Sequence, residues 1–218
     1  MTERLRLFPL QMVLFPGMPL SLQVFEDRYR TLVAECIEAG EPFGVALIRE
    51  GAEVGGPAVP FTMGTTARIR RVSPARDGRI LLEARGVRRF RTTELFDDRP
   101  YLSAHVEYPV DEDTDVPPLA MEEVLHHYKQ LERLKDTIAG EYHRVARVPE
   151  APGALADAVG AAARGHIGDR RLQRLLETLS VSKRLDASAE LMVTIISATH
   201  QQAAAVVAQR WAAVERRN

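Results

Sequence analysis

The chain has 218 residues, and its 29 basic and 30 acidic residues give a net charge of −1. This balance provides no general attraction for nucleic acid or anionic lipid. Cys36 is the single cysteine, which excludes an intramolecular disulfide and a cysteine-based zinc site and favours a reducing, cytoplasmic setting. No run reaches the ~18 consecutive apolar residues of a membrane-spanning helix, so we expect no membrane partner.

The apolar opening stretch at 6–25 predicts a strand, a turn and a second strand. Its three prolines would break the helix of a signal peptide, so we expect no such signal. Proline and glycine at 16–17 predict the turn, and alternation over 20–25 predicts the second strand. The turn itself is apolar and either lies exposed, where it could capture extended peptides, or packs on the loop at 50–62.

A helix is predicted to follow from residue 27, because apolar residues recur at helical spacing and Gly40 suits its end. The apolar stripe consists of Tyr29, Leu32, Val33, Cys36 and Ile37. Further strands are predicted at 43–48, 64–73 and 101–110, with a hairpin turn at Asp77-Gly78. Several short strands separated by turn residues indicate a compact barrel or a strongly bent sheet.

The composition changes at 111–118, where an acidic stretch ends in two prolines and is typical of a linker. After it the periodicity is helical, including one long last helix from about residue 182. We therefore predict an α+β fold with a β-barrel domain at 1–112, a linker at 113–118 and a helical bundle at 119–218. Ser182 is the expected N-cap of the last helix.

Several segments resemble, in order and spacing, the N-terminal substrate-binding domain family of Lon protease. They are "LFPL", "VLFPGMPLSL", "VFEDRYRTLV", "FGVALI", "GTTARI", "DGRILLEARGVRRFR", "YLSAHVEY" and "LQRLLETLSVSKRLDASAELM". The resemblance implies a PUA-like β-barrel with one helix, followed by a helical bundle. No G-x-x-x-x-G-K-[ST] occurs, so the chain looks like a stand-alone member without the ATPase and protease modules.

The resemblance also implies a non-catalytic module that binds unfolded or damaged polypeptide without a cofactor, and such a module could act as an adaptor to a protease or chaperone. The mechanism that we expect is apolar contact combined with strand addition, either at a sheet edge or in a groove between the two halves of the chain. The residues predicted to bind polypeptide lie in the first turn and at the following strand–helix junction: Phe15, Pro16, Met18, Phe25, Glu26, Arg28 and Tyr29. Glu26 and Arg28 can equally form a structural ion pair that orients the helix.

Three other features carry alternative hypotheses. Arginines cluster at 68–91, and Arg68, Arg70, Arg89 and Arg91 could form an RNA-binding face of the barrel, although a solvated, salt-bridged face explains them better. Ser180 and Lys183 form an S-x-x-K pattern found in some hydrolases, which helix capping explains more simply. His126 and His127 are adjacent on a predicted helix and cannot easily share a metal ion, so we expect no metal site.

Overall fold

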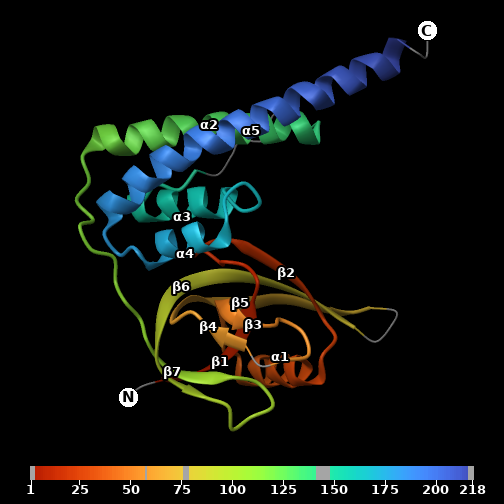
Figure 1. Cartoon of the computed structure of the whole chain (residues 1–218), viewed down its shortest axis with the longest axis vertical. Helices are drawn as coiled ribbons and strands as arrows, with labels where there is room; N and C mark the ends of the chain where they lie inside the picture. Colours follow the sequence, from red (N-terminus) through yellow and green to blue (C-terminus); the bar gives the residue numbers. More distant parts are fainter. Residues whose placement is uncertain (1–2, 57, 76–78, 141–147, 216–218) are drawn as a thin grey trace. The chain divides into compact units, whose positions relative to one another are not determined.

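The computed structural model describes residues 3–56, 58–75, 79–140 and 148–215, and the predicted Asp77-Gly78 turn lies outside them. The chain folds into two compact units. The first comprises Met1–Val110 with Asp169–Leu179, and the second comprises Asp111–Gly168 with Ser180–Asn218. The first unit is mainly sheet and the second is helical, which confirms the predicted α+β class (Figure 1).

The strands of the first unit form one sheet that closes on itself. They are β1 (Glu3–Leu10), β2 (Pro19–Val24), β3 (Phe43–Gly51), β4 (Ala58–Pro60), β5 (Met63–Pro74), β6 (Ile80–Phe96) and β7 (Ser103–Glu107). Strands β1, β7, β6, β5 and β3 are neighbours in that order, and a parallel β3–β1 pairing closes the ring. Strand β2 pairs with β6 outside the ring, and β4 pairs with β3. The predicted barrel is therefore confirmed.

The Phe90 side chain fills the interior of this ring, where two glycines make room for it. Phe90 has no exposed surface, and it packs in a cluster with Leu5, Leu7, Ala46, Ala104 and Val106. A Cβ atom on Gly64 would lie 2.5 Å from the Phe90 ring and 2.4 Å from a backbone oxygen, and one on Gly44 would lie 2.9 Å from the same ring. The close packing of the ring thus depends on residues that lack a side chain.

Helix α1 (Asp27–Ala39) covers part of the sheet and follows its sequence pattern closely. Four members of the predicted stripe are buried, but Ile37 is 53% exposed because it lies at the margin of the buried face. Gly40 ends the helix in the left-handed conformation, with its N–H directed at the carbonyls of Cys36 and Ile37. Burial raises the pKa of the Cys36 thiol to about 11, so this thiol is protonated at neutral pH.

The strand predicted before the first turn ends at Leu10, although the apolar residues that follow it are buried. Residues 11–18 have no strand pairing, and Met12, Val13 and Leu14 are each at most 9% exposed. The Leu14 carbonyl accepts a hydrogen bond from the Thr65 hydroxyl at 2.6 Å instead of entering a ladder. Burial at this segment therefore comes from packing on the sheet.

Helix α4 (Asp169–Glu177) groups with the sheet unit, although it follows the expected linker in the sequence. Its buried Gln173 donates a hydrogen bond from Nε2 to the Met63 carbonyl at 3.0 Å. Its Leu176 carbonyl accepts one from Arg89 Nε at 2.9 Å. These two bonds attach the helix to β5 and β6.

The second unit contains α2 (Pro118–Ala139), α3 (Pro152–Ala162) and the long α5 (Val181–Glu215). At ~1.5 Å per residue the 35 residues of α5 extend over about 52 Å, in agreement with the long last helix that we predicted. Helices α2 and α5 run in the same direction, and Arg210 donates hydrogen bonds to the last carbonyls of α2, those of Thr137 and Ile138. The α2–α5 pair is thereby fixed at its C-terminal end.

Part of α5, Val181–Arg210, is long and apolar enough to cross a membrane when judged by length and composition alone. We expected no such segment, because polar residues interrupt every apolar run. However, residues 191–209 contain no aspartate, glutamate, lysine or arginine, so the polar residues that interrupt the apolar runs lower the hydropathy little. Helix α5 also packs on α2 and α3, and 28% of its most apolar window is buried.

A buried ion cluster ties the beginning of α5 to the chain that precedes α2. Arg184 has no exposed surface and donates to both carboxylate oxygens of Asp111, at 2.8 and 2.7 Å. Its Nε also lies 3.6 Å from the buried Asp157 on α3. Burial alone would lower the pKa of Arg184, but the hydrogen bonds of Asp111 and the charge of Asp157 raise it. The first residue of the acidic 111–118 stretch is therefore a structural anchor.

We expect Gly64→Ala to destabilise the protein by about 1–3 kcal/mol, because the new methyl group overpacks the ring interior. Urea unfolding, followed by far-UV circular dichroism, measures this loss of stability. Gly168→Ala is the matched control, since a Cβ atom there meets nothing within 4 Å. Equal stability of the two variants would contradict the role given to Gly64.

We expect Arg184→Met to cost about 3–5 kcal/mol, because it leaves the carboxylate of Asp157 buried without its cation. Thermal or urea unfolding again supplies the measurement. The neighbouring Lys183 is exposed, so Lys183→Met should stay within about 0.5 kcal/mol of the wild type. A small effect of Arg184→Met would show that the cluster contributes little.

Candidate functional site

Strand β2 forms an edge of the sheet that carries no charge. Among the described strands it pairs with β6 alone, and its sequence is PLSLQV. The other edges are protected in ways that oppose pairing with a foreign strand. From Arg68 to Pro74, β5 pairs only with β6 but carries three arginines and ends in proline, while β4 has three residues and also ends in proline.

A crevice of about 150 Å³ lies beside β2. Part of its wall comes from β1 and from residues 21–25. The rest comes from the start of α1 and from the loop after β3. The lining residues outside 21–25 are Phe8, Leu10, Glu26, Tyr29, Glu53 and Val54. At ~30 Å³ per water molecule it holds about five waters, whereas small-molecule pockets usually measure ~300–1,000 Å³. The crevice thus suits one amino-acid side chain better than a cofactor.

Aromatic rings form one wall of the crevice. Phe8 and Tyr29 stack with their centroids 3.9 Å apart, and the Arg28 guanidinium lies over the Tyr29 ring at 4.5 Å. Burial raises the pKa of the Tyr29 hydroxyl. Phe25 stands at the rim and is 47% exposed. The crevice therefore has a rigid aromatic wall and an accessible ring at its mouth.

The Glu26–Arg28 pair holds the neighbouring loop in place. Arg28 lies 3.0 Å from Glu26 Oε2 and also donates to the backbone carbonyls of Glu53 and Gly56, both at 3.3 Å. The Gly55 N–H donates to the same Glu26 oxygen at 3.3 Å. This pair has the structural role that the sequence suggested, and it also fixes the loop that lines the crevice.

The predicted polypeptide-binding residues divide into two groups. Phe25, Glu26, Arg28 and Tyr29 come together at the crevice or directly behind it.

The first-turn residues form the other group. The expectation of an exposed turn is wrong, since Phe15 is 1% and Met18 is 6% exposed, and Pro16 is half-buried. The turn packs on β6 because Gly86, which lacks a side chain, exchanges backbone hydrogen bonds with Gly17 and Met18 at 2.9 Å.

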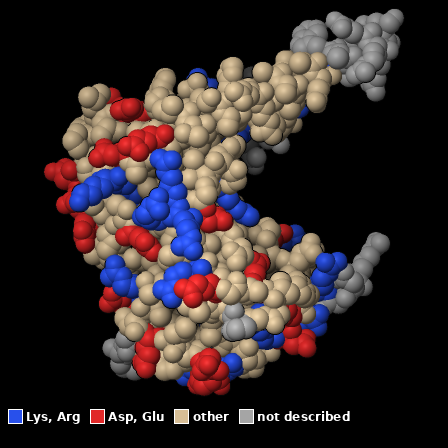
Figure 2. Space-filling model, viewed as in Figure 1, with Lys and Arg blue, Asp and Glu red and all other residues tan. Residues whose placement is uncertain are grey.

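The four arginines of the alternative RNA-binding face are not equally available. Arg89 is 6% exposed and is held by the Leu176 carbonyl of α4, so its predicted accessibility is wrong. Arg91 pairs with Glu107 at 3.1 Å, while Arg68 and Arg70 are exposed. Figure 2 shows acidic and basic side chains interspersed on the visible face. Arg76, another member of the cluster, lies outside the described residues.

The S-x-x-K pattern serves to begin a helix. The Ser180 hydroxyl accepts a hydrogen bond from the Lys183 backbone N–H at 3.3 Å, and α5 begins at residue 181. The capping residue is therefore Ser180 instead of the expected Ser182. Ser180 is 7% exposed, whereas the Lys183 side chain is exposed and is not desolvated as a catalytic base would need.

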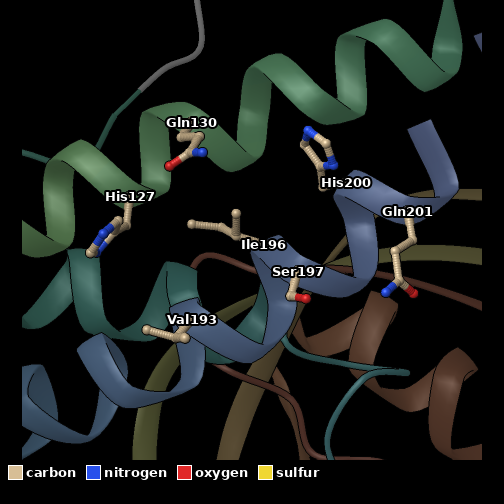
Figure 3. Close-up of a pocket in the computed structure, with 7 residues that line it drawn as sticks. All are labelled: His127, Gln130, Val193, Ile196, Ser197, His200 and Gln201. Atoms are coloured by element: carbon tan, nitrogen blue, oxygen red, sulfur yellow. The ribbon is translucent and has the colours of Figure 1, made fainter. Parts of the chain in front are cut away.

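A second, more open cavity of about 450 Å³ lies between α2 and α5. Figure 3 shows His127 on α2 and His200 on α5 at opposite ends of its lining, separated by Gln130 and Ile196. The two imidazoles are therefore not brought together as metal ligands. Within the part of the chain that the structure describes, no group of three or more potential metal ligands occurs.

Sequence reasoning missed three features of the crevice: Phe8, Glu53 and the free edge of β2. Phe8 and Glu53 come from separate segments of the chain, so no local sequence pattern predicts that they line the same crevice. The edge left a signal, since "PLSLQV" is a strand sequence without charged residues.

Comparisons with known proteins identify the family. The family described as "ATP-dependent protease La (LON) substrate-binding domain" matches residues 4–194. Lon protease of Syntrophus aciditrophicus is 25% identical over 181 residues, covering 79% of this chain and 22% of the relative. Lon protease of Paraburkholderia phytofirmans is 32% identical over 190 residues, covering 84% and 23%. The chain thus spans less than a quarter of the length of these curated relatives.

Two solved structures have a similar fold. The Lon N-terminal domain protein from Xanthomonas campestris is 28% identical, with a TM-score of 0.61 over 84% of this chain and 95% of that one. The N-terminal domain of the Mycobacterium avium complex Lon protease is 20% identical and shares the fold, with a TM-score of 0.65 over 88% and 98%. The chain therefore belongs to the Lon substrate-binding domain family, which confirms the resemblance found in its sequence.

Proposed function

We propose that this protein binds extended, unfolded polypeptide by adding it as a strand to the edge of β2. The observation that carries the proposal is the uncharged β2 edge beside a crevice of side-chain size. Backbone hydrogen bonds along the edge would supply affinity for many sequences, and the crevice would hold one side chain. Membership of a substrate-binding domain family supports a polypeptide as the ligand.

The same mode of binding suits an adaptor. A strand held at an edge by its backbone stays accessible along the rest of its length, so a protease or chaperone could receive it. The adaptor role in protein quality control and the cytoplasmic setting are parts of this proposal that rest on the resemblance. The buried Phe15 and Met18 are left out of the proposed site.

A charged residue on the β2 edge should block binding. We expect Ser21→Lys to weaken binding by about tenfold, or about 1.4 kcal/mol. A lysine on an edge strand opposes pairing with a further strand. Ser21 is exposed and lies opposite Glu83 on β6, so a lysine fits the folded protein. The assay is fluorescence anisotropy with a labelled, uncharged decapeptide of alternating threonine and valine with one central norleucine.

Ser197→Lys is the matched control, because Ser197 is exposed and lines the cavity between α2 and α5. The affinity of the Ser197→Lys variant for the peptide should stay within about twofold of the wild-type affinity. The reverse result, weak binding only in Ser197→Lys, would move the site to the helical unit. A labelled single-stranded RNA run in parallel tests the alternative ligand, and binding of RNA alone would overturn the proposal.

Backbone methylation of the peptide tests strand addition directly. Three N-methyl groups on alternate residues remove about three hydrogen bonds of ~1 kcal/mol each, so we expect binding to weaken about a hundredfold. Methylation of the other alternate set, whose N–H groups would face solvent, should have little effect. The central norleucine holds the register in both peptides. Equal affinity of the two methylated peptides would exclude strand addition.

A further inference from the structure

The crevice beside β2 has an apolar floor that could enclose an aliphatic chain. Phe8, Leu10 and Val24 line it and are each at most 5% exposed. These three side chains already lie in the core, so they form a fixed surface. A guest side chain would cover this surface with methylene groups, each of which contributes about 0.8 kcal/mol when fully buried.

The same crevice carries two carboxylates, those of Glu26 and Glu53. Their described hydrogen bonds all use Oε2. Glu26 Oε2 accepts from Arg28 and Gly55, and Glu53 Oε2 accepts from the Gln11 N–H at 2.6 Å. Because an ionised carboxylate offers about four lone-pair sites, the Oε1 atoms retain capacity to accept from a guest.

Both charged residues that line the crevice are acidic. Arg28 contacts Glu26 and the Glu53 backbone, and Arg79 donates to Gln23 at 2.9 Å. Neither arginine lines the crevice, whereas both carboxylates do. Both carboxylates also act electrostatically on the buried Tyr29 hydroxyl, whose pKa is raised first by its burial. The crevice therefore combines an apolar floor with two carboxylates in its lining.

We infer that the crevice selects a lysine or arginine side chain of the bound strand. The aliphatic stem lies along the apolar floor, and the cationic head reaches Glu26 and Glu53. Long cationic side chains bury their stems and keep their heads in polar surroundings, which is the arrangement that this crevice offers. The half-exposed Phe25 ring at the mouth adds a surface over which a cation can lie.

This inference rests on the proposed function and deepens it. Strand addition alone would accept many sequences, whereas the crevice would favour segments with one cationic residue among uncharged neighbours. The preference should be moderate, because the crevice is open to solvent and exposed ion pairs are weak.

The test compares three labelled decapeptides that differ only at the central residue: arginine, norleucine or glutamate. At low salt we expect the arginine peptide to bind about fivefold more tightly than the norleucine peptide. The glutamate peptide should bind more weakly than both. The advantage of arginine should shrink at high salt, because screening weakens exposed ion pairs, while binding of the norleucine peptide persists.

Glu53→Gln is the decisive variant, since glutamine keeps an oxygen that can accept from the Gln11 N–H. It should reduce the preference for arginine over norleucine to about twofold or less. Glu38→Gln is the control, because Glu38 is an exposed residue of α1 that does not line the crevice. It should leave the preference unchanged.

The outcomes separate the two proposals. If the norleucine peptide binds and Ser21→Lys blocks it, but arginine gives no advantage, the inference about the crevice is wrong and strand addition stands. If Glu53→Gln and Glu38→Gln reduce the preference equally, the effect is one of general charge and the inference is again wrong. If none of the peptides binds, the proposed function itself fails.

Discussion

The closure of the sheet into a ring is the constraint on which the rest of the first unit depends. Phe90 fills the interior, Gly44 and Gly64 leave room for it, and the parallel β1–β3 pairing completes the circle. Strand β6 has 17 residues and is longer than the ring requires, so its first half extends beyond the circle. That half pairs with β5 on one side and β2 on the other. The free edge of β2 is thus a consequence of how the ring closes.

Patterns within a short segment predicted the local structure well. Four of the five residues of the predicted α1 stripe are buried, Gly40 ends that helix, and the long last helix is present. The predicted binding residues Phe25, Glu26 and Tyr29 all line the crevice because they are contiguous at the strand–helix junction, and their role in binding stays a prediction. In each case the relevant pattern lies within a few turns of helix or a few residues of strand. Within such a segment, the spacing of apolar residues indicates which side chains are buried.

The failures share a physical cause, which is contact between residues far apart in the sequence. The strand pattern predicts an accessible Arg89 side chain, but this side chain donates to the carbonyl of Leu176 on α4, 87 residues away. Met18 and Phe15 look exposed until the turn packs on Gly86. Asp111 looks like part of a solvated linker until Arg184, 73 residues away, binds it. Burial of such groups is decided by tertiary partners that periodicity does not reveal.

The two interpretations of Glu26 and Arg28, a structural pair and a binding surface, turn out to be compatible. Arg28 fastens the loop through the carbonyls of Glu53 and Gly56, and this places the Glu53 side chain at the crevice beside β2. Glu26 forms an ion pair with the Arg28 guanidinium, which holds Arg28 at Glu26 and at the loop. Two carboxylates, those of Glu26 and Glu53, then line an apolar crevice next to an edge that lacks the arginines of β5. A guest strand with a cationic side chain complements both features at once, because its backbone pairs with the edge while its charge neutralises the crevice.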